Sequence, residues 1–206
     1  MKGLTTFLLV MQMAGATAMS AMANKPVKVK VSQDAFVQGG NTANEPMGVT
    51  ESGELRIMKS GGTDKYSRTS YLQFNLKKVE DFTSVDLNIC VKVYESKEDA
   101  SAEFEMQVYA CDDNKWSESS LAFNNKPEKG DLLATQTMGV NEKNEWVKIS
   151  LPADKVKQLL KKSKKGKITL VLSNDNFNKT SAIVISKERL WSNGTPANRE
   201  AFLQFK

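Results

Sequence analysis

The amino-acid sequence predicts an all-β fold, a two-sheet jelly-roll sandwich with one short helix. Short runs in which apolar and polar residues alternate recur along the chain, as they do in strands that bury one face. Stretches rich in Gly, Asn and charged residues separate these runs, and one segment has the apolar spacing of a helix. About nine short strands with a single helix are typical of a jelly roll.

Two short strands are expected first. Val27–Val31 alternates strictly, so its valines should face inward while Lys28 and Lys30 face outward. Asp34–Val37 follows as a second piece. Residues 39–48 contain adjacent glycines and a proline, which predicts a long loop.

The next strands are expected at Leu55–Ile57 and Ser70–Leu76. Arg56 is opposite in phase to its apolar neighbours, and Tyr71 has the outward phase of its strand. Arg68 shares the phase of the inward-facing residues. It therefore has two alternatives, facing a ligand or turning inward to a carboxylate.

Val85–Val93 is the clearest strand, and residues 104–110 repeat its pattern. The charged and small residues between them predict an antiparallel hairpin. Its register would place Cys90 and Cys111 about 13 Å apart along the sheet. A disulfide needs Cα atoms within about 7 Å, so no bridge is predicted.

One helix is expected after Pro152, which suits a first helical position, and it should end at Gly166. Its last turn is rich in lysine, which indicates either a solvated helix end or an anion-binding patch. The remaining strands are expected at Leu132–Met138, Glu145–Leu151, Ile168–Leu172, Ala182–Ile185 and Ala201–Phe205. Trp146 has the outward phase of its strand.

The stretch Asp112–Pro127 is too polar for core, yet it contains Trp116, Phe123 and paired asparagines. It is interpreted as an ordered corner of the sandwich, in which Asn side chains satisfy backbone groups. Trp116 either pins this corner to the core or forms an exposed platform for a ligand.

Residues 1–23 have the pattern of a secretory signal peptide, with Lys2, an apolar run and an A-x-A cleavage site at Ala21–Ala23. The mature protein would be an exported single domain over residues 24–206. The apolar run is too short and interrupted for a membrane span, and no later segment could cross a bilayer.

Composition limits the chemistry. The chain has no His, which excludes Ser-His-Asp and Cys-His nucleophile systems and His metal ligands. The net charge of +5 would fall to about +4 after signal removal, because Lys2 is lost. That mild excess fits a local basic patch, and nucleic-acid binding is not expected.

Several motifs, in order along the chain, resemble one known family. They are Asp34-Ala35-Phe36-Val37-x-Gly-Gly, Leu55-Arg56-Ile57-x-Lys59, Tyr66-Ser67-Arg68-x-x-Tyr71-Leu72-Gln73-Phe74, an Asp-Trp-Glu pattern before Phe123-Asn124-Asn125-x-Pro127, and Ser186-Lys187-Glu188-Arg189. The chain is identified as similar to the DNRLRE domains, also called carbohydrate-binding module family 96. The family usually has Asn-Arg at Ser67-Arg68 and Asp at Asn75.

The resemblance implies a secreted, noncatalytic module that binds acidic polysaccharide such as alginate. It also implies a role for the basic segment that carries Arg56, Lys59, Lys65 and Arg68. A polyuronate presents one carboxylate per sugar, so a complementary surface needs several fixed cations and an aromatic ring. The candidate ligand-binding residues are Arg56, Lys59, Lys65, Arg68, Tyr71, Lys28 and Lys30.

Other functions stay open from the sequence. A polysaccharide lyase could use Tyr66 or Tyr71 with Arg56 or Arg68, and a hydrolase would need paired carboxylates. A structural or adhesive surface protein is another alternative, and a separate secreted enzyme or matrix is an expected partner. Structural Ca²⁺ is common in such sandwich modules, and its ligands are expected among Asp112, Asp113 and Glu118.

Overall fold

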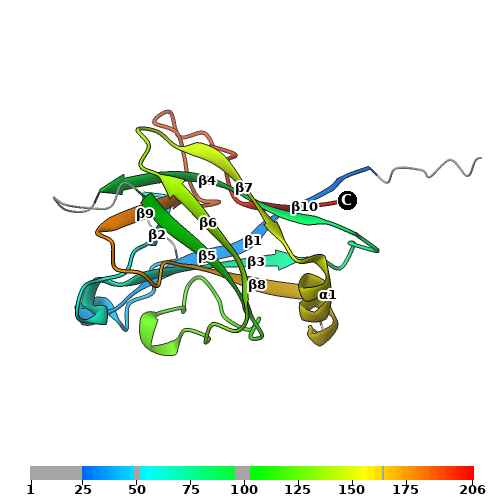
Figure 1. Cartoon of the computed structure of the whole chain (residues 1–206), viewed down its shortest axis with the longest axis horizontal. Helices are drawn as coiled ribbons and strands as arrows, with labels where there is room; N and C mark the ends of the chain where they lie inside the picture. The colour runs from blue at the N-terminus through cyan, green and yellow to red at the C-terminus, as the bar shows by residue number, and fades with distance from the viewer. Residues whose placement is uncertain (1–24, 49–51, 96–102, 164) are drawn as a thin grey trace, which may run out of the picture.

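The computed structural model describes residues 25–48, 52–95, 103–163 and 165–206. The predicted signal peptide and the loop after residue 95 lie outside these ranges. The described chain forms ten strands and one helix: β1 Val27–Gln38, β2 Glu54–Ile57, β3 Arg68–Asn75, β4 Val85–Glu95, β5 Glu103–Cys111, β6 Leu132–Gly139, β7 Glu145–Leu151, α1 Ala153–Lys162, β8 Lys167–Ser173, β9 Thr180–Ile185 and β10 Phe202–Phe205. The predicted two-sheet jelly roll with one short helix is confirmed (Figure 1).

Strand β1 belongs to both sheets. Its first half pairs with β10, its second half pairs with β3, and the register shifts between Val31 and Gln33. Sheet A contains β7, β4, β9, β10, β2 and the start of β1, with β4 paired to β7 along one edge and to β9 and β10 along the other. Sheet B runs β1-β3-β8-β5-β6. The two segments predicted separately at Val27–Val31 and Asp34–Val37 are therefore one bent strand.

The main core lies between the sheets. Alternate residues of β4, from Val85 to Val93, face alternate residues of β5 and β8, such as Phe104 and Leu170. Helix α1 closes one end of this core with Val156 and Leu159 (Figure 1). Because burial of apolar surface is the main driving force, the alternation in the sequence determines which face of each strand points inward.

The predicted β4–β5 hairpin is wrong. Strand β4 lies in sheet A, whereas β5 pairs with β6 and β8 in sheet B. Cys90 and Cys111 are both buried and free, as expected, but for a different reason. Their side chains point away from the core on opposite sheets, which pack about 10 Å apart.

A second, smaller core lies on the outside of sheet B, beneath the corner at residues 112–127. Trp116 is 9% exposed, and its indole N–H donates to the Thr169 hydroxyl at 3.1 Å. The Asn125 carboxamide accepts from the N–H of Ala122 and donates to the carbonyl of Ser120. The corner is therefore ordered as predicted, and Trp116 pins it to the sheet.

Candidate functional site

The outer face of sheet A carries exposed aromatic and basic side chains that could meet a ligand. Leu87 and Ile89 of β4 point into the core, so the residues between them point outward. The strand registers then place three rows on this face: Lys28 beside Gln204 and Asp86, Lys30 beside Phe202 and Asn88, and Arg56 beside Ile183 and Lys92.

A hollow of about 470 Å³ opens on this face. Two tryptophans line it, and both keep almost half of their surface exposed, Trp146 at 48% and Trp191 at 46%. The other lining residues are Lys143, Asn144, Glu145, Ile185, Arg189, Ala197 and Arg199. This group is called the tryptophan hollow below.

The tryptophan hollow combines ring faces with a guanidinium. The Arg199 guanidinium lies 5.4 Å from the centre of the Trp191 ring, and its Nη1 is 4.0 Å from the sulfur of the buried Cys90. Trp146 contacts Phe202 edge to face, with ring centres 5.4 Å apart. The Lys28 ammonium lies 3.6 Å above the Phe202 ring, so aromatic and cationic groups continue from the hollow along the sheet.

The segment between β9 and β10 holds two of these groups in place. Its backbone folds back on itself, with the Trp191 N–H donating to the Thr195 carbonyl at 2.8 Å and the Ala197 N–H donating to the Arg189 carbonyl at 2.8 Å. The turn at its tip uses Gly194, which has φ of 79°. A backbone-bonded loop of this kind presents Trp191 without burying it.

Three predicted binding residues lie on the outer face of sheet A. Lys28 is exposed above Phe202, while Lys30 forms an ion pair with Glu200. Arg56 lies 3.3 Å from Glu54, and its side chain is 39% exposed. The structure thus brings Lys28, Lys30 and Arg56 onto one face, although two of them already have acidic neighbours.

The other predicted cations are placed differently. Arg68 turns inward, where its Nε donates to the Gln38 side chain at 2.7 Å instead of to a carboxylate. Burial lowers the pKa of Arg68, and the nearby Arg56 lowers it further. Lys59 is half-buried, and Lys65 is exposed with its ammonium 5.4 Å from the Tyr66 ring, in the β2–β3 connection.

Tyr71 is not on an exposed surface, and the expectation that it faces a ligand is wrong. Its side chain is fully buried under the corner, and its hydroxyl donates to the Pro127 carbonyl at 2.9 Å. Trp116 packs against its ring, with centres 6.1 Å apart. Burial raises the pKa of Tyr71 well above its usual value, so this residue does not suit the role of a base either.

The residues expected to bind calcium do not meet. Asp112 pairs with Lys162 at 2.9 Å, and Asp113 accepts the N–H of Lys115 at 2.8 Å. Glu118 instead accepts the backbone N–H of Asp34 at 2.7 Å, on the edge of β1. Among the described residues, the predicted set Asp112, Asp113 and Glu118 therefore does not form one metal site.

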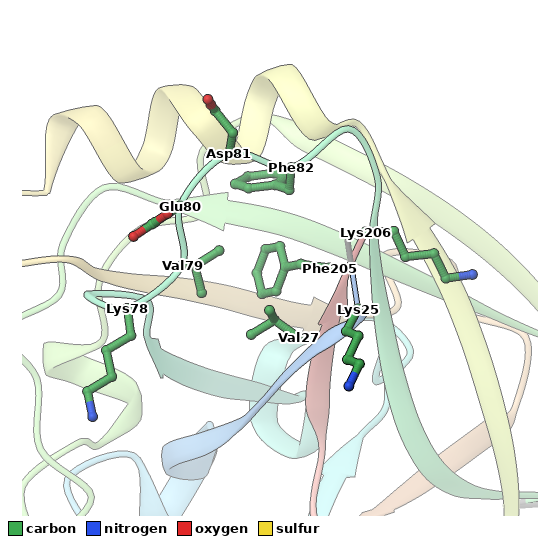
Figure 2. A pocket seen from close by; sticks show the side chains of 9 residues that line it. All are labelled: Lys25, Val27, Lys78, Val79, Glu80, Asp81, Phe82, Phe205 and Lys206. Atoms are coloured by element: carbon green, nitrogen blue, oxygen red, sulfur yellow. The ribbon is translucent and has the colours of Figure 1, made fainter. Parts of the chain in front are cut away.

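Two other hollows fit a glycan less well. One of about 270 Å³ lies where the core reaches the end of the sandwich, and Figure 2 shows Phe82, Phe205 and Val79 forming its apolar floor. Another of about 580 Å³ is lined by Lys115, Lys162, Lys165 and Lys167 beside Trp116. The first lacks an exposed ring face, and in the second the only indole is largely buried.

Sequence reasoning missed Arg189, Trp191 and Arg199. They lie in a segment without strand or helix periodicity, which the motifs marked only as the closing part of the resemblance. An isolated Trp in such a polar stretch was the available signal, because a large apolar residue outside a periodic element needs either a packing partner or a ligand.

The profile of carbohydrate-binding module family 96 matches residues 25–193. Among curated proteins, none matches the sequence significantly. Similar solved structures include the CBM36-1 domain of a multidomain xylanase from the hindgut metagenome of Trinervitermes trinervoides, with TM-score 0.37 and 8% identity over 88% of this chain and 98% of that one. A cleaved adhesin domain of Lys-gingipain from Porphyromonas gingivalis has TM-score 0.34 and 11% identity over 88% of this chain and 90% of that one. No helix among the described residues is long and apolar enough to span a membrane.

Proposed function

The chain belongs to carbohydrate-binding module family 96, and from that premise we propose that it is an exported, noncatalytic module that binds acidic polysaccharide. The proposed ligand is a uronate polymer such as alginate, and the proposed binding surface is the outer face of sheet A. The observation that carries this proposal is the Arg199 guanidinium above the Trp191 ring, in a hollow that Trp146 also lines.

These groups match the chemistry of a uronate chain. A sugar ring presents an apolar C–H face that can lie on an indole, and each residue of the polymer adds one carboxylate. The planar fork of Arg can bind a carboxylate through two parallel hydrogen bonds. Within the hollow, Lys143 and Arg199 outnumber the single acidic lining residue, Glu145, and a third cation, Arg189, also pairs with Glu54 at 3.4 Å.

The ion pairs on this face do not prevent binding. The Lys30 and Arg56 side chains are 56% and 39% exposed, whereas their partners Glu200 and Glu54 are only 12% and 20% exposed. A ligand carboxylate would therefore add to the free donors of the two cations and leave the acidic partners in place. We assign Lys28, Lys30 and Arg56 supporting roles, along the sheet from the tryptophan hollow.

Affinity electrophoresis through gels that contain alginate, pectin or a neutral glucan tests the ligand class. We expect retardation by the acidic gels, and less of it at high salt, because screening weakens exposed charge pairs. Strong retention by a neutral glucan with none by the acidic gels would contradict the proposal. Release of unsaturated products from alginate would instead indicate a lyase.

A structural or adhesive role in a matrix is the second candidate. It shares the basic outer face but needs assembly of the chain with itself or with another secreted protein. Sedimentation would favour it if it showed a defined oligomer in a protein that no glycan gel retards.

A further inference from the structure

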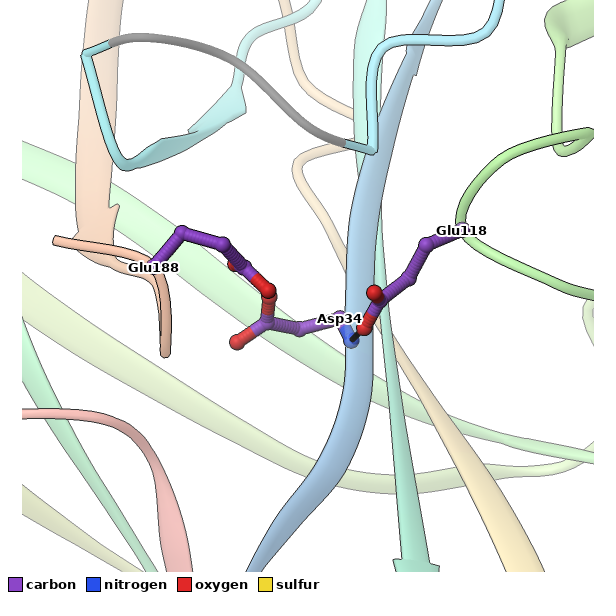
Figure 3. A group of neighbouring side chains, drawn as sticks. All are labelled: Asp34, Glu118 and Glu188. Carbon is purple, nitrogen blue, oxygen red and sulfur yellow. Dashed lines mark hydrogen bonds between the residues drawn. The ribbon is translucent and has the colours of Figure 1, made fainter.

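Three carboxylates from distant parts of the chain meet at the edge of β1. Asp34, Glu118 and Glu188 each offer an oxygen, and these oxygens all lie within 4.8 Å of one another. Figure 3 shows the carboxylates of Asp34 and Glu188 directed at each other, while Glu118 approaches the backbone of Asp34. We propose that this cluster binds one divalent cation of the calcium class.

The buried oxygens of the cluster lack partners. The Asp34 side chain is fully buried, and its Oδ2 accepts the N–H of Lys187 at 3.0 Å. Its Oδ1, like Oε2 of Glu188, is buried without a hydrogen-bond partner among the described residues. A buried carboxylate oxygen without a donor is costly, and a metal ion would satisfy both oxygens.

Charge within the cluster is also incomplete. The one ammonium there, on Lys187, lies 3.1 Å from Glu118 and contacts Glu188, which leaves Asp34 uncompensated. A divalent ion would offset two of the three carboxylate charges, where the ammonium offsets only one.

The ligand set selects the class of metal. Carboxylates are hard oxygen ligands, which suit calcium. Two ligands on one calcium ion, each at 2.3–2.6 Å, lie at most about 5 Å apart, so the spread of 4.8 Å fits one ion. Lys187, with its side chain 29% exposed, can move its ammonium toward solvent.

Two glycines let the surrounding backbone come close enough to form the cluster. A Cβ at Gly48 would overlap the carbonyl of Glu118, and a Cβ at Gly53 would overlap the backbone of Arg189, next to Glu188. Gly53 also has φ of 59°, which disfavours other residues. The site thus joins β1 to the corner and to the segment that carries Trp191.

Thermal unfolding in CaCl₂ and in EDTA, without any glycan, tests the site. At a calcium concentration about a hundred times Kd, we expect Tm to rise by roughly 5–10 °C. Titration calorimetry should give one calcium per chain. Asp34→Asn should keep the fold, since Asn has nearly the shape of Asp, and should abolish the shift, as should Glu188→Gln.

Asp112→Asn is the matched control, because Asp112 is exposed and outside the cluster, and its shift should equal that of the wild type. Lys187→Met should bind calcium about tenfold more tightly, because a competing positive charge is removed. Unchanged affinity would contradict the claim that calcium displaces the Lys187 ammonium from the carboxylates. Absence of both heat and shift in the wild type would overturn the proposal. A Tm shift that persists in Asp34→Asn and in Glu188→Gln would also overturn the proposal, because calcium would then bind only elsewhere on the surface. Neither outcome depends on glycan binding, so each is separable from the proposed function.

Discussion

Removal of the Trp146 ring should weaken binding without unfolding the protein. Trp146 is 48% exposed, which for a side chain of about 250 Å² leaves about 120 Å² accessible. A sugar ring on one face would cover about half of this, roughly 60 Å², and so contribute about 1.5 kcal/mol. Trp146→Ala should therefore raise Kd about tenfold.

Titration calorimetry with alginate oligosaccharides measures this change, and Tm reports whether the fold is intact. Phe177→Ala is a matched control, because Phe177 is 50% exposed and lies outside the tryptophan hollow. The reasoning is refuted if Trp146→Ala binds as tightly as the wild type, or if both variants lose affinity equally.

Three further predictions concern charge, packing and pH. Arg199→Lys should raise Kd several-fold with Tm unchanged, because Lys cannot make the paired bonds of a guanidinium; calorimetry at low salt measures it. Tyr71→Phe should destabilise the protein by about 1 kcal/mol in urea unfolding, because it removes the bond to Pro127, and glycan affinity should be unchanged. Burial alone would raise the pKa of Asp175, but bonds from Lys129 and two hydroxyls hold this pKa below its usual value. The stabilisation is thus present above about pH 4 and lost as the pH falls through the lowered pKa, so Asp175→Asn should cost roughly 2 °C in Tm at pH 7 and much less at pH 3.

Sequence alternation predicted which face of each strand is buried, but it did not predict which strands pair. The residues of β4 from Val85 to Val93 point inward as expected. The prediction that β4 pairs with β5 was wrong, because alternation contains no information about which sheet a strand joins. A charged connection between two strands fits a hairpin and a crossing between sheets equally well.

The misplacement of Tyr71 has a related cause. Its phase put it correctly on the outer side of sheet B, but the corner at residues 112–127 covers that side. The segment that covers Tyr71 is about 50 residues away in the sequence, so the alternation within β3 cannot reveal that Tyr71 is buried. Trp146 had the same outward phase and remains 48% exposed, because none of the described segments covers it completely.

The pairing of β1 with β10 has a mechanical consequence. Val27 lies beside Phe205 and Lys30 beside Phe202, so both ends of the described chain leave from the same end of the sandwich (Figure 1). Tension applied between those ends would peel this short ladder like a zipper, one hydrogen bond after another, instead of shearing all of it at once. A tether attached to only one of these ends would not pull the two strands in opposite directions, so the β1–β10 ladder would stay closed.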